Sequence, residues 1–223
     1  MKVRRFASAD ELGAALRALI GDACARESAR HVALAVGRTT LPHYRRLDEH
    51  EEALRGRILL PVDELVPPPA RDDLAFSARL RVSLPAHLPG RFRAIRVRLD
   101  AEAEAAGLER ELEDLGLAVC VLGLGPDGHI ALNQPGSPVD SRTRIVEIEP
   151  ENLARLGDVA PATRALTLGV ATLLAACEIV LVVDGAEKQA ALERVLEGPP
   201  GDDVPASLLH GHPRCSVFVR DEA

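Results

Sequence analysis

The sequence predicts an α/β fold, a modified Rossmann-like three-layer sandwich in which helices cover both faces of a mostly parallel sheet. Three observations favour this class. Helical and strand-like patterns alternate along the chain, which is typical of parallel strands joined by helices. Several strand-like segments are continuous apolar runs, as expected for strands buried on both faces. No internal repeat, low-complexity tract or linker interrupts the pattern, so residues 1–223 are expected to form one domain.

The first part of the chain carries the clearest helix start. A capping-box pattern at 8–11 precedes apolar residues at helical spacing and predicts a helix over about 9–26. The apolar run at 31–36 predicts a buried strand, and 57–64 predicts a second strand that Pro61 weakens near its end. Further helices are expected at 41–54 and from Asp72 or Asp73 to about 84, with a strand at 92–99.

The alternation continues in the second part of the chain. Asp100 is placed to cap a helix over 101–116. The apolar run at 117–125 predicts a buried strand, and a loop follows it at 126–138. The remaining expected elements are strands at 144–149, 178–185 and 215–221 and helices at 169–177 and 187–197.

Charge and composition exclude several classes of partner. The net charge is -7, and aromatic residues make up 2% of the chain. No nucleic-acid partner is expected, because such a surface needs positive charge and rings on which bases stack. A small anion remains compatible with this charge, since a few local donors suffice to hold one phosphate.

The chain also lacks membrane, export and metal signals. No apolar run approaches about 20 residues, so no membrane span is expected. The N-terminus becomes charged too soon for a secretory signal, and the four cysteines lack CxxC spacing. Both features favour a cytoplasmic protein with buried free thiols. No cluster has metal-ligand spacing, so no metal or other cofactor is expected.

Ligands of parallel α/β sheets bind at the carboxyl ends of strands, here the loops after residues 36, 62, 125 and 184. The loop near 125 contains Gly-Leu-Gly-Pro-Asp-Gly at 123–128, a formal match to the dinucleotide pattern G-x-G-x-x-G. A dinucleotide site also needs a helix directly after the glycines, but Pro and Gly residues leave room for only about two turns. The glycines are better explained as residues that let the backbone turn tightly.

Two of these loops carry groups suited to acid–base chemistry. Asp127 lies two residues before His129, a spacing that lets a carboxylate orient an imidazole. Asp63 and Glu64 end the strand predicted at 57–64 and are expected at the same edge of the sheet. Taken alone, such a His is usually structural, and such carboxylates are usually solvated. A carboxylate and an imidazole that converge on one pocket are what general acid–base catalysis requires.

Two other loops could hold an anion. Residues 37–40, Gly-Arg-Thr-Thr, combine backbone N–H groups, two hydroxyls and a guanidinium between a strand and a helix. They do not form a Walker A motif, and a plain capping turn explains them equally well. Lys188, one of only two lysines, follows the strand expected at 178–185. It is either a phosphate partner or a surface residue at a helix start.

Several of these stretches resemble the superfamily of glucosamine-6-phosphate deaminases and 6-phosphogluconolactonases, enzymes that act on sugar phosphates. The strongest match is LGLGPDGHIALNQPGS at 122–137, followed by SRTR at 141–144. The segment at 165–192 is also similar to the deaminases, whereas VDELVPPP at 62–69 is similar to the lactonases. The resemblance implies a sugar phosphate as substrate and covers nearly the whole chain.

The resemblance implies a catalytic set of Asp63, Asp127, His129 and Gln134. In the deaminases, the residue matching Asp63 moves a proton between C2 and C1 of the open sugar. The residue matching His129 opens the pyranose ring, with Asp127 beside it. Gln134 stands where the family pattern has Glu, so it can hydrogen-bond His129 but cannot raise the pKa of the imidazole by charge. The substrate-binding residues implied are Gly37, Arg38, Thr39, Thr40, Glu64, Asn133 and Lys188.

Three functions follow from this resemblance. The leading expectation is a deaminase that converts an aminohexose 6-phosphate to a ketohexose 6-phosphate and ammonia. The first alternative is a 6-phosphogluconolactonase, which needs only His129 as a base for water that attacks an ester carbonyl. The second alternative is a non-catalytic sugar-phosphate-binding protein. The neutral Gln134 would suit it, and so would the loop 37–40, in which Arg38 and Thr40 stand where the family's phosphate loop usually has Gly and Pro. A homo-oligomeric state is left open.

Overall fold

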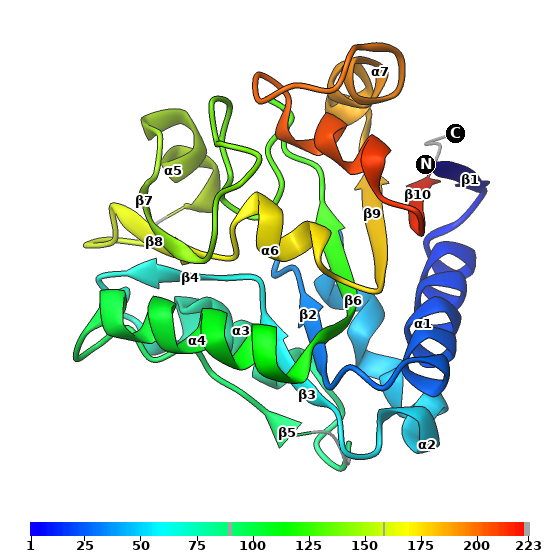
Figure 1. Ribbon diagram of the computed structural model, residues 1–223, viewed down its shortest axis with the longest axis horizontal. Coiled ribbons are helices and arrows are strands. Elements are labelled where there is room, and N and C mark those ends of the chain that lie inside the picture. Colours follow the sequence, from blue (N-terminus) through cyan, green and yellow to red (C-terminus); the bar gives the residue numbers. More distant parts are fainter. Residues whose placement is uncertain (89–90, 158, 221–223) are drawn as a thin grey trace.

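The computed structural model describes residues 1–88, 91–157 and 159–220 (Figure 1). Within this part of the chain, the centre is a seven-stranded sheet with the order β1-β10-β9-β6-β2-β3-β5. Every pairing in this sheet is parallel. The strands are β1 (Lys2–Phe6), β2 (His31–Leu34), β3 (Ile58–Pro61), β5 (Arg91–Phe92), β6 (Leu117–Gly123), β9 (Glu178–Asp184) and β10 (Cys215–Arg220).

Helices cover both faces of this sheet, which confirms the predicted α/β three-layer class. One face packs against α1 (Ala9–Arg26), α2 (Glu51–Leu54), α3 (Phe76–Ser83) and a 3-10 helix at Leu41–His50. The other face packs against α4 (Ala101–Leu115), α6 (Val170–Leu174), α7 (Gln189–Glu197) and a 3-10 helix at Pro205–Gly211. In β6, Val119 and Val121 enter the first layer while Cys120 and Leu122 enter the second, as strand alternation requires. The apolar runs of the sequence are therefore strands buried on both faces.

A second, antiparallel sheet was not expected from the sequence. It has the order β4-β8-β7 and consists of β4 (Asp63–Val66), β8 (Arg164–Thr167) and β7 (Arg144–Glu147). The single strand predicted at 57–64 is wrong, because the chain leaves the parallel sheet at Val62. Pro61 has no N–H with which to continue the ladder. The backbone of Val62 is bonded to both sheets, since its N–H donates to Leu34 O at 3.3 Å and its carbonyl accepts from Leu168 N at 3.0 Å.

The two strongest helix predictions are confirmed by their caps. The Ser8 side chain accepts a hydrogen bond from Glu11 N at 3.2 Å, at the start of α1. The Asp100 side chain accepts one from Ala103 N at 2.8 Å, at the start of α4. Each bond satisfies a backbone donor that has no partner within the first helical turn.

Other predicted boundaries differ from the structure. The edge strand β1 was missed because its exposed and charged residues give no apolar run. The strand expected at 92–99 is reduced to a short pairing in β5, although Ile95 and Val97 are still buried. The segment 41–54 is mostly 3-10 helix, and the helix expected at 169–177 is limited to α6. The strand 215–221 is present as β10 up to Arg220, and Asp221 lies outside the described residues.

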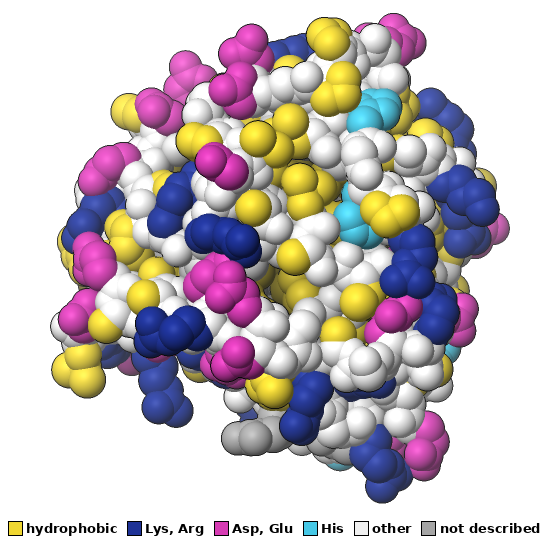
Figure 2. All heavy atoms as spheres, viewed as in Figure 1, with side chains coloured by type: hydrophobic (Ala, Val, Ile, Leu, Met, Phe, Trp, Pro, Cys, Tyr) yellow, Lys and Arg dark blue, Asp and Glu magenta, His cyan; other side chains and the backbone are white. Residues whose placement is uncertain are grey.

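The surface carries charges of both signs. Positive and negative side chains are interspersed over the face seen in Figure 2, without a large patch of one sign. None of the described helices is long and apolar enough to cross a membrane. All four cysteines are free thiols, and only Cys177 is partly exposed.

One buried carboxylate, Glu109 of α4, ties the second sheet to the main layer. It accepts hydrogen bonds from Thr143 N at 3.0 Å and Thr172 Oγ1 at 2.8 Å. It also accepts from the Thr143 hydroxyl and from Arg142. Burial alone would raise the pKa of Glu109, but these donors outweigh burial and lower it. The carboxylate therefore holds the start of β7 and helix α6 against α4.

We expect Glu109→Ala to lower the free energy of unfolding by about 2–3 kcal/mol, because several buried donors lose their acceptor. Glu113→Ala, one turn further along α4 at a side chain 53% exposed, is the matched control. This control should cost less than about 1 kcal/mol. Urea denaturation of the three proteins measures both values. Equal losses in the two variants would contradict the role given to Glu109.

Candidate active site

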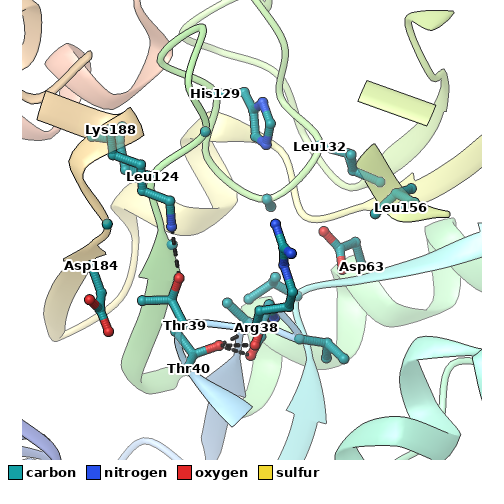
Figure 3. A pocket seen from close by; sticks show the side chains of 18 of the residues that line it. Arg38, Thr39, Thr40, Asp63, Leu124, His129, Leu132, Leu156, Asp184 and Lys188 are labelled. Atoms are coloured by element: carbon teal, nitrogen blue, oxygen red, sulfur yellow. Dashed lines mark hydrogen bonds between the residues drawn. The ribbon is translucent and has the colours of Figure 1, made fainter. Parts of the chain in front are cut away.

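A cavity of about 480 Å³ opens at the carboxyl edge of the parallel sheet. The loops that follow β2, β3, β6 and β9 all contribute to its wall, as the topology of parallel sheets predicts (Figure 3). Its polar lining residues are Arg38, Thr39, Thr40, Asp63, His129, Asp184, Glu187, Lys188 and Arg220. Asp63 and His129, which are far apart in the sequence, thus face the same space.

Hydroxyl and ammonium groups gather on one side of the cavity. Thr40 is fully buried and donates its hydroxyl to Ala35 O at 2.7 Å, which fixes the loop 37–40 after β2. Thr39 instead accepts a hydrogen bond from Lys188 Nζ at 2.7 Å. Burial lowers the pKa of Lys188, although the nearby Glu187 and Asp184 act in the opposite direction. Hydroxyl, ammonium and backbone N–H groups therefore meet at one end of the cavity.

Arg38 extends from the same loop into the middle of the cavity (Figure 3). Arg220, at the end of β10, adds a third cation to the wall. Its Nε donates to Asp184 Oδ1 at 2.6 Å. Asp184 and Arg220 were missed, although each is the last residue of a strand whose carboxyl end forms this edge.

Asp63 is the buried carboxyl group of the cavity. It is the first residue of β4, and 6% of its surface is exposed. Burial raises its pKa to about 8, and the neighbouring Glu64 carboxylate adds to the rise while Arg79 opposes it. Asp63 can therefore hold or release a proton near neutral pH, which is the property that a general acid–base group needs.

Glu64 does not line the cavity, in contrast to its expected role in substrate binding. Successive residues of a strand point to opposite sides, so Glu64 faces away from Asp63. Its carboxylate accepts hydrogen bonds from Leu65 N at 2.9 Å, Phe76 N at 2.8 Å and Ser77 N at 2.7 Å. The structure thus gives Glu64 a structural role at the start of α3.

His129 reaches the cavity from the loop that follows β6 and is held by Asp127 (Figure 3). The distance from His129 Nδ1 to Asp127 Oδ1 is 2.6 Å. Burial alone would raise the pKa of Asp127, but hydrogen bonds from His129 and Asn152 lower it well below its ordinary value. Because the ionised carboxylate can only accept, Nδ1 carries the proton, and in the neutral form of the ring Nε2 is then the acceptor.

Two glycines of the 123–128 stretch are required by the conformation of the loop that carries His129. A Cβ atom at Gly125 would lie 2.2 Å from His129 Nδ1, so only glycine leaves room for the imidazole. Gly128 has a φ of +94°, which favours glycine at the turn. No helix starts at these glycines, so the dinucleotide interpretation is excluded by the structure as well.

Asn133 and Gln134 lie behind the cavity wall and not in it. Asn133 is fully buried and donates to Leu168 O at 2.8 Å, so it fixes the loop to the end of β8. Gln134 does not bond His129 directly, which corrects the expectation for this residue. Its Oε1 accepts from Asn152 Nδ2 at 3.1 Å, and Asn152 Nδ2 also donates to Asp127 Oδ2 at 3.0 Å. Asn152, on α5 (Pro150–Leu156), was missed because it belongs to no motif.

No group of three His, Cys, Asp or Glu side chains within the described ranges could hold a metal ion. The cavity combines three kinds of group: hydrogen-bond donors that could hold an anion, the buried carboxyl group of Asp63, and the imidazole of His129 held by Asp127. This set can bind a phosphate ester and transfer protons at the opposite end of the same molecule.

The chain is similar to known proteins along its length. A family model described as glucosamine-6-phosphate isomerases/6-phosphogluconolactonase matches residues 4–217. A glucosamine-6-phosphate deaminase of Streptococcus gordonii is 31% identical over 100% of this chain and 97% of its own length. One of Rhodopirellula baltica is 44% identical over 126 residues, which span 54% of this chain and 46% of that protein.

Solved structures show the same relationship. A monomeric glucosamine-6-phosphate deaminase matches with a TM-score of 0.90 at 26% identity, covering 100% of this chain and 98% of that one. A 6-phosphogluconolactonase of Thermotoga maritima matches with a TM-score of 0.77 at 20% identity, covering 99% of each chain, and shows the shared fold. The resemblance seen in the sequence is thus confirmed: the chain belongs to the enzyme family of glucosamine-6-phosphate isomerases and 6-phosphogluconolactonases.

Proposed function

We propose that this protein is a glucosamine-6-phosphate deaminase, which converts glucosamine 6-phosphate and water to fructose 6-phosphate and ammonia. The observation that carries the proposal is the buried carboxyl group of Asp63 in the same cavity as His129. A reaction that moves a proton between two carbons needs such a group, whereas hydrolysis of a lactone needs only a base for water. The deaminase relatives support the same choice.

The phosphate of the substrate would bind at the end formed by Thr39, Lys188 and the backbone N–H groups of Arg38 and Thr39, since those of Gly37 and Thr40 donate within the loop. The ammonium group of Lys188 is already directed at this place by its bond to Thr39. A phosphate anchored there leaves the sugar to extend across the cavity toward Asp63 and His129. Fixing one end of the substrate in this way orients the other end for reaction.

His129 would open the pyranose ring. Its Nε2 accepts the proton of the C1 hydroxyl and returns a proton to the ring oxygen as the C1–O5 bond breaks. Asp127 keeps Nδ1 protonated and stabilises the imidazolium that forms between these two transfers. The product of this step is the open-chain amino aldehyde.

Asp63 would then carry out the isomerisation. Its carboxylate takes the proton from C2, the electron pair forms the C1–C2 double bond, and the π pair of the C1 carbonyl moves onto O1. O1 takes a proton from the C2 ammonium of the substrate, which gives an enolamine. The protonated carboxyl group delivers a proton to C1, so that C2 becomes a C=N carbon. One water adds to C2 and ammonia leaves, which completes the ketone.

The direct test is ammonia release from glucosamine 6-phosphate by the purified protein. Asp63→Asn should lower kcat by about 100- to 10,000-fold, because the C2–C1 proton transfer loses its acid–base group. Hydrolysis of 6-phosphoglucono-δ-lactone is measured in parallel. Lactone hydrolysis without ammonia release would reject the deaminase in favour of the lactonase. Phosphosugar binding without either reaction would indicate a non-catalytic binding protein.

The pH dependence of kcat/KM provides a second prediction. Asp63 must be ionised to accept the C2 proton, and its pKa in the free enzyme is raised to about 8. We therefore expect kcat/KM to rise with pH through an acidic limb centred near 8. An acidic limb near pH 4, as for a solvated aspartate, would contradict the role of burial.

The same carboxyl group should lower stability at high pH. Between about pH 4 and 8 the unfolded chain loses the Asp63 proton while the folded chain keeps it, so stability falls as pH rises through this window. Asp63→Asn removes this slope of up to about 1.4 kcal/mol per pH unit. Its stability relative to wild type should therefore increase from pH 5 to pH 8 in urea denaturation. A pH-independent difference, as expected for the exposed control Asp140→Asn, would refute this prediction.

A further inference from the structure

Asn152 is a buried amide on α5 that the proposed reaction does not use. It is 5% exposed and hydrogen-bonds three side chains, two from the loop after β6 and one from its own helix. Its Nδ2 donates to Asp127 Oδ2 at 3.0 Å and to Gln134 Oε1 at 3.1 Å. Its Oδ1 accepts from Arg155 Nη1 at 2.9 Å. All of its hydrogen-bonding groups are therefore engaged.

The orientation of this network is set by the backbone beyond β7. Gln134 Nε2 donates to Glu147 O at 2.8 Å, and Gln134 Oε1 accepts from Glu149 N at 2.7 Å. Because a carbonyl oxygen only accepts and a backbone N–H only donates, the Gln134 amide fits in one orientation. Its oxygen then faces Asn152, so Asn152 must turn its NH₂ group toward both Gln134 and Asp127.

This chain of constraints explains why residue 134 is neutral. A glutamate could accept from Glu149 N and from Asn152, but its second oxygen would face the carbonyl of Glu147 without a proton to donate. A carboxylate at this position would leave two acceptors opposed in a buried place, which is unfavourable. An amide satisfies both backbone groups.

The network ends at the imidazole. Asp127 Oδ2 accepts the hydrogen bond from Asn152 Nδ2. Asp127 Oδ1 lies 2.6 Å from His129 Nδ1 and accepts from the His129 backbone N–H at 3.1 Å. The Asn152 bond therefore fixes the rotation of the carboxylate that holds His129. Leu156, one turn further along α5, lines the cavity itself. One short helix thus supplies both a cavity wall and the support of the imidazole.

We propose that Asn152 is a positioning residue: through Asp127 it holds His129 with Nδ1 protonated and Nε2 facing the substrate, and Gln134 is the neutral residue that orients it. The effect on turnover rests on the proposed function. The effect on the imidazole does not, because the state of the ring exists without substrate.

The first experiment reads the ring directly. Nitrogen-15 NMR of histidine-labelled protein, with the His129 signals assigned from a His129→Gln sample, should show a single Nδ1–H tautomer in the wild type. Asn152→Ala should give a mixture of tautomers at the same pH. Glu151→Gln, an exposed change at the neighbouring position of α5, should leave the signals unchanged. An unaltered Nδ1–H tautomer in folded Asn152→Ala would overturn the proposal.

The second experiment measures turnover if the wild type releases ammonia from glucosamine 6-phosphate. Asn152→Ala should lower kcat on the order of 10-fold with KM changed much less, the size expected for one hydrogen bond to a charged group. In the Asp127→Asn background the same change should cost little more, because both act on one ring. Full additivity of the two effects would mean that Asn152 acts elsewhere, and would overturn the proposal.

Gln134→Glu keeps the proposal testable if Asn152→Ala does not fold. The positioning network predicts a lower kcat than wild type for this variant, because the new carboxylate opposes Glu147 O. A kcat equal to or above that of wild type would contradict the network. If the wild type itself releases no ammonia, the proposed function fails while the NMR result still decides the role of Asn152.

Discussion

At the carboxyl end of β3 the chain leaves the parallel sheet within two residues. Pro61 cannot continue the ladder, Val62 is bonded to both sheets, and Asp63 begins the antiparallel strand β4. This change of sheet places a carboxyl group at the edge where ligands bind while the surrounding strands exclude water from it. The raised pKa of Asp63 follows from that burial first and from Glu64 second. The proposed chemistry depends on this placement, because an aspartate with the ordinary pKa of a solvated group would be a much weaker base toward the C2 proton.

The rest of the cavity separates two tasks. Loops that follow β2 and β9 contribute Thr39 and Lys188, the groups proposed to hold the phosphate, and the loop that follows β6 contributes His129. The parallel sheet provides the rigid frame that all of these loops share. Network residues behind the wall, Asn152 and Gln134, hold the imidazole without touching the cavity. Binding and proton transfer can thus be altered by mutation at different positions.

The features that the sequence predicts correctly are local or topological. The helix over 9–26 follows from a capping pattern, and the common edge of the site follows from the parallel arrangement of buried apolar strands. The features that it misses depend on tertiary contacts. The adjacent residues Asp63 and Glu64 differ in role because successive residues of β4 point to opposite sides of the sheet. Which of the two points into the cavity is decided by the pairing of β4 with β8, which the sequence does not reveal. Asn152 lies on a short helix without a motif, and the positioning role proposed for it depends on a hydrogen bond to Asp127, a residue distant in the sequence.

The protonation state of Asp63 is the most direct test of this account. Carbon-13 NMR of protein labelled at the aspartate carboxyl carbons, with Asp63 assigned from the Asp63→Asn spectrum, would follow its titration without substrate. The account predicts a titration midpoint near pH 8. A midpoint near pH 4, the value of an aspartate in water, would show that the carboxyl group is solvated and would contradict the central claim.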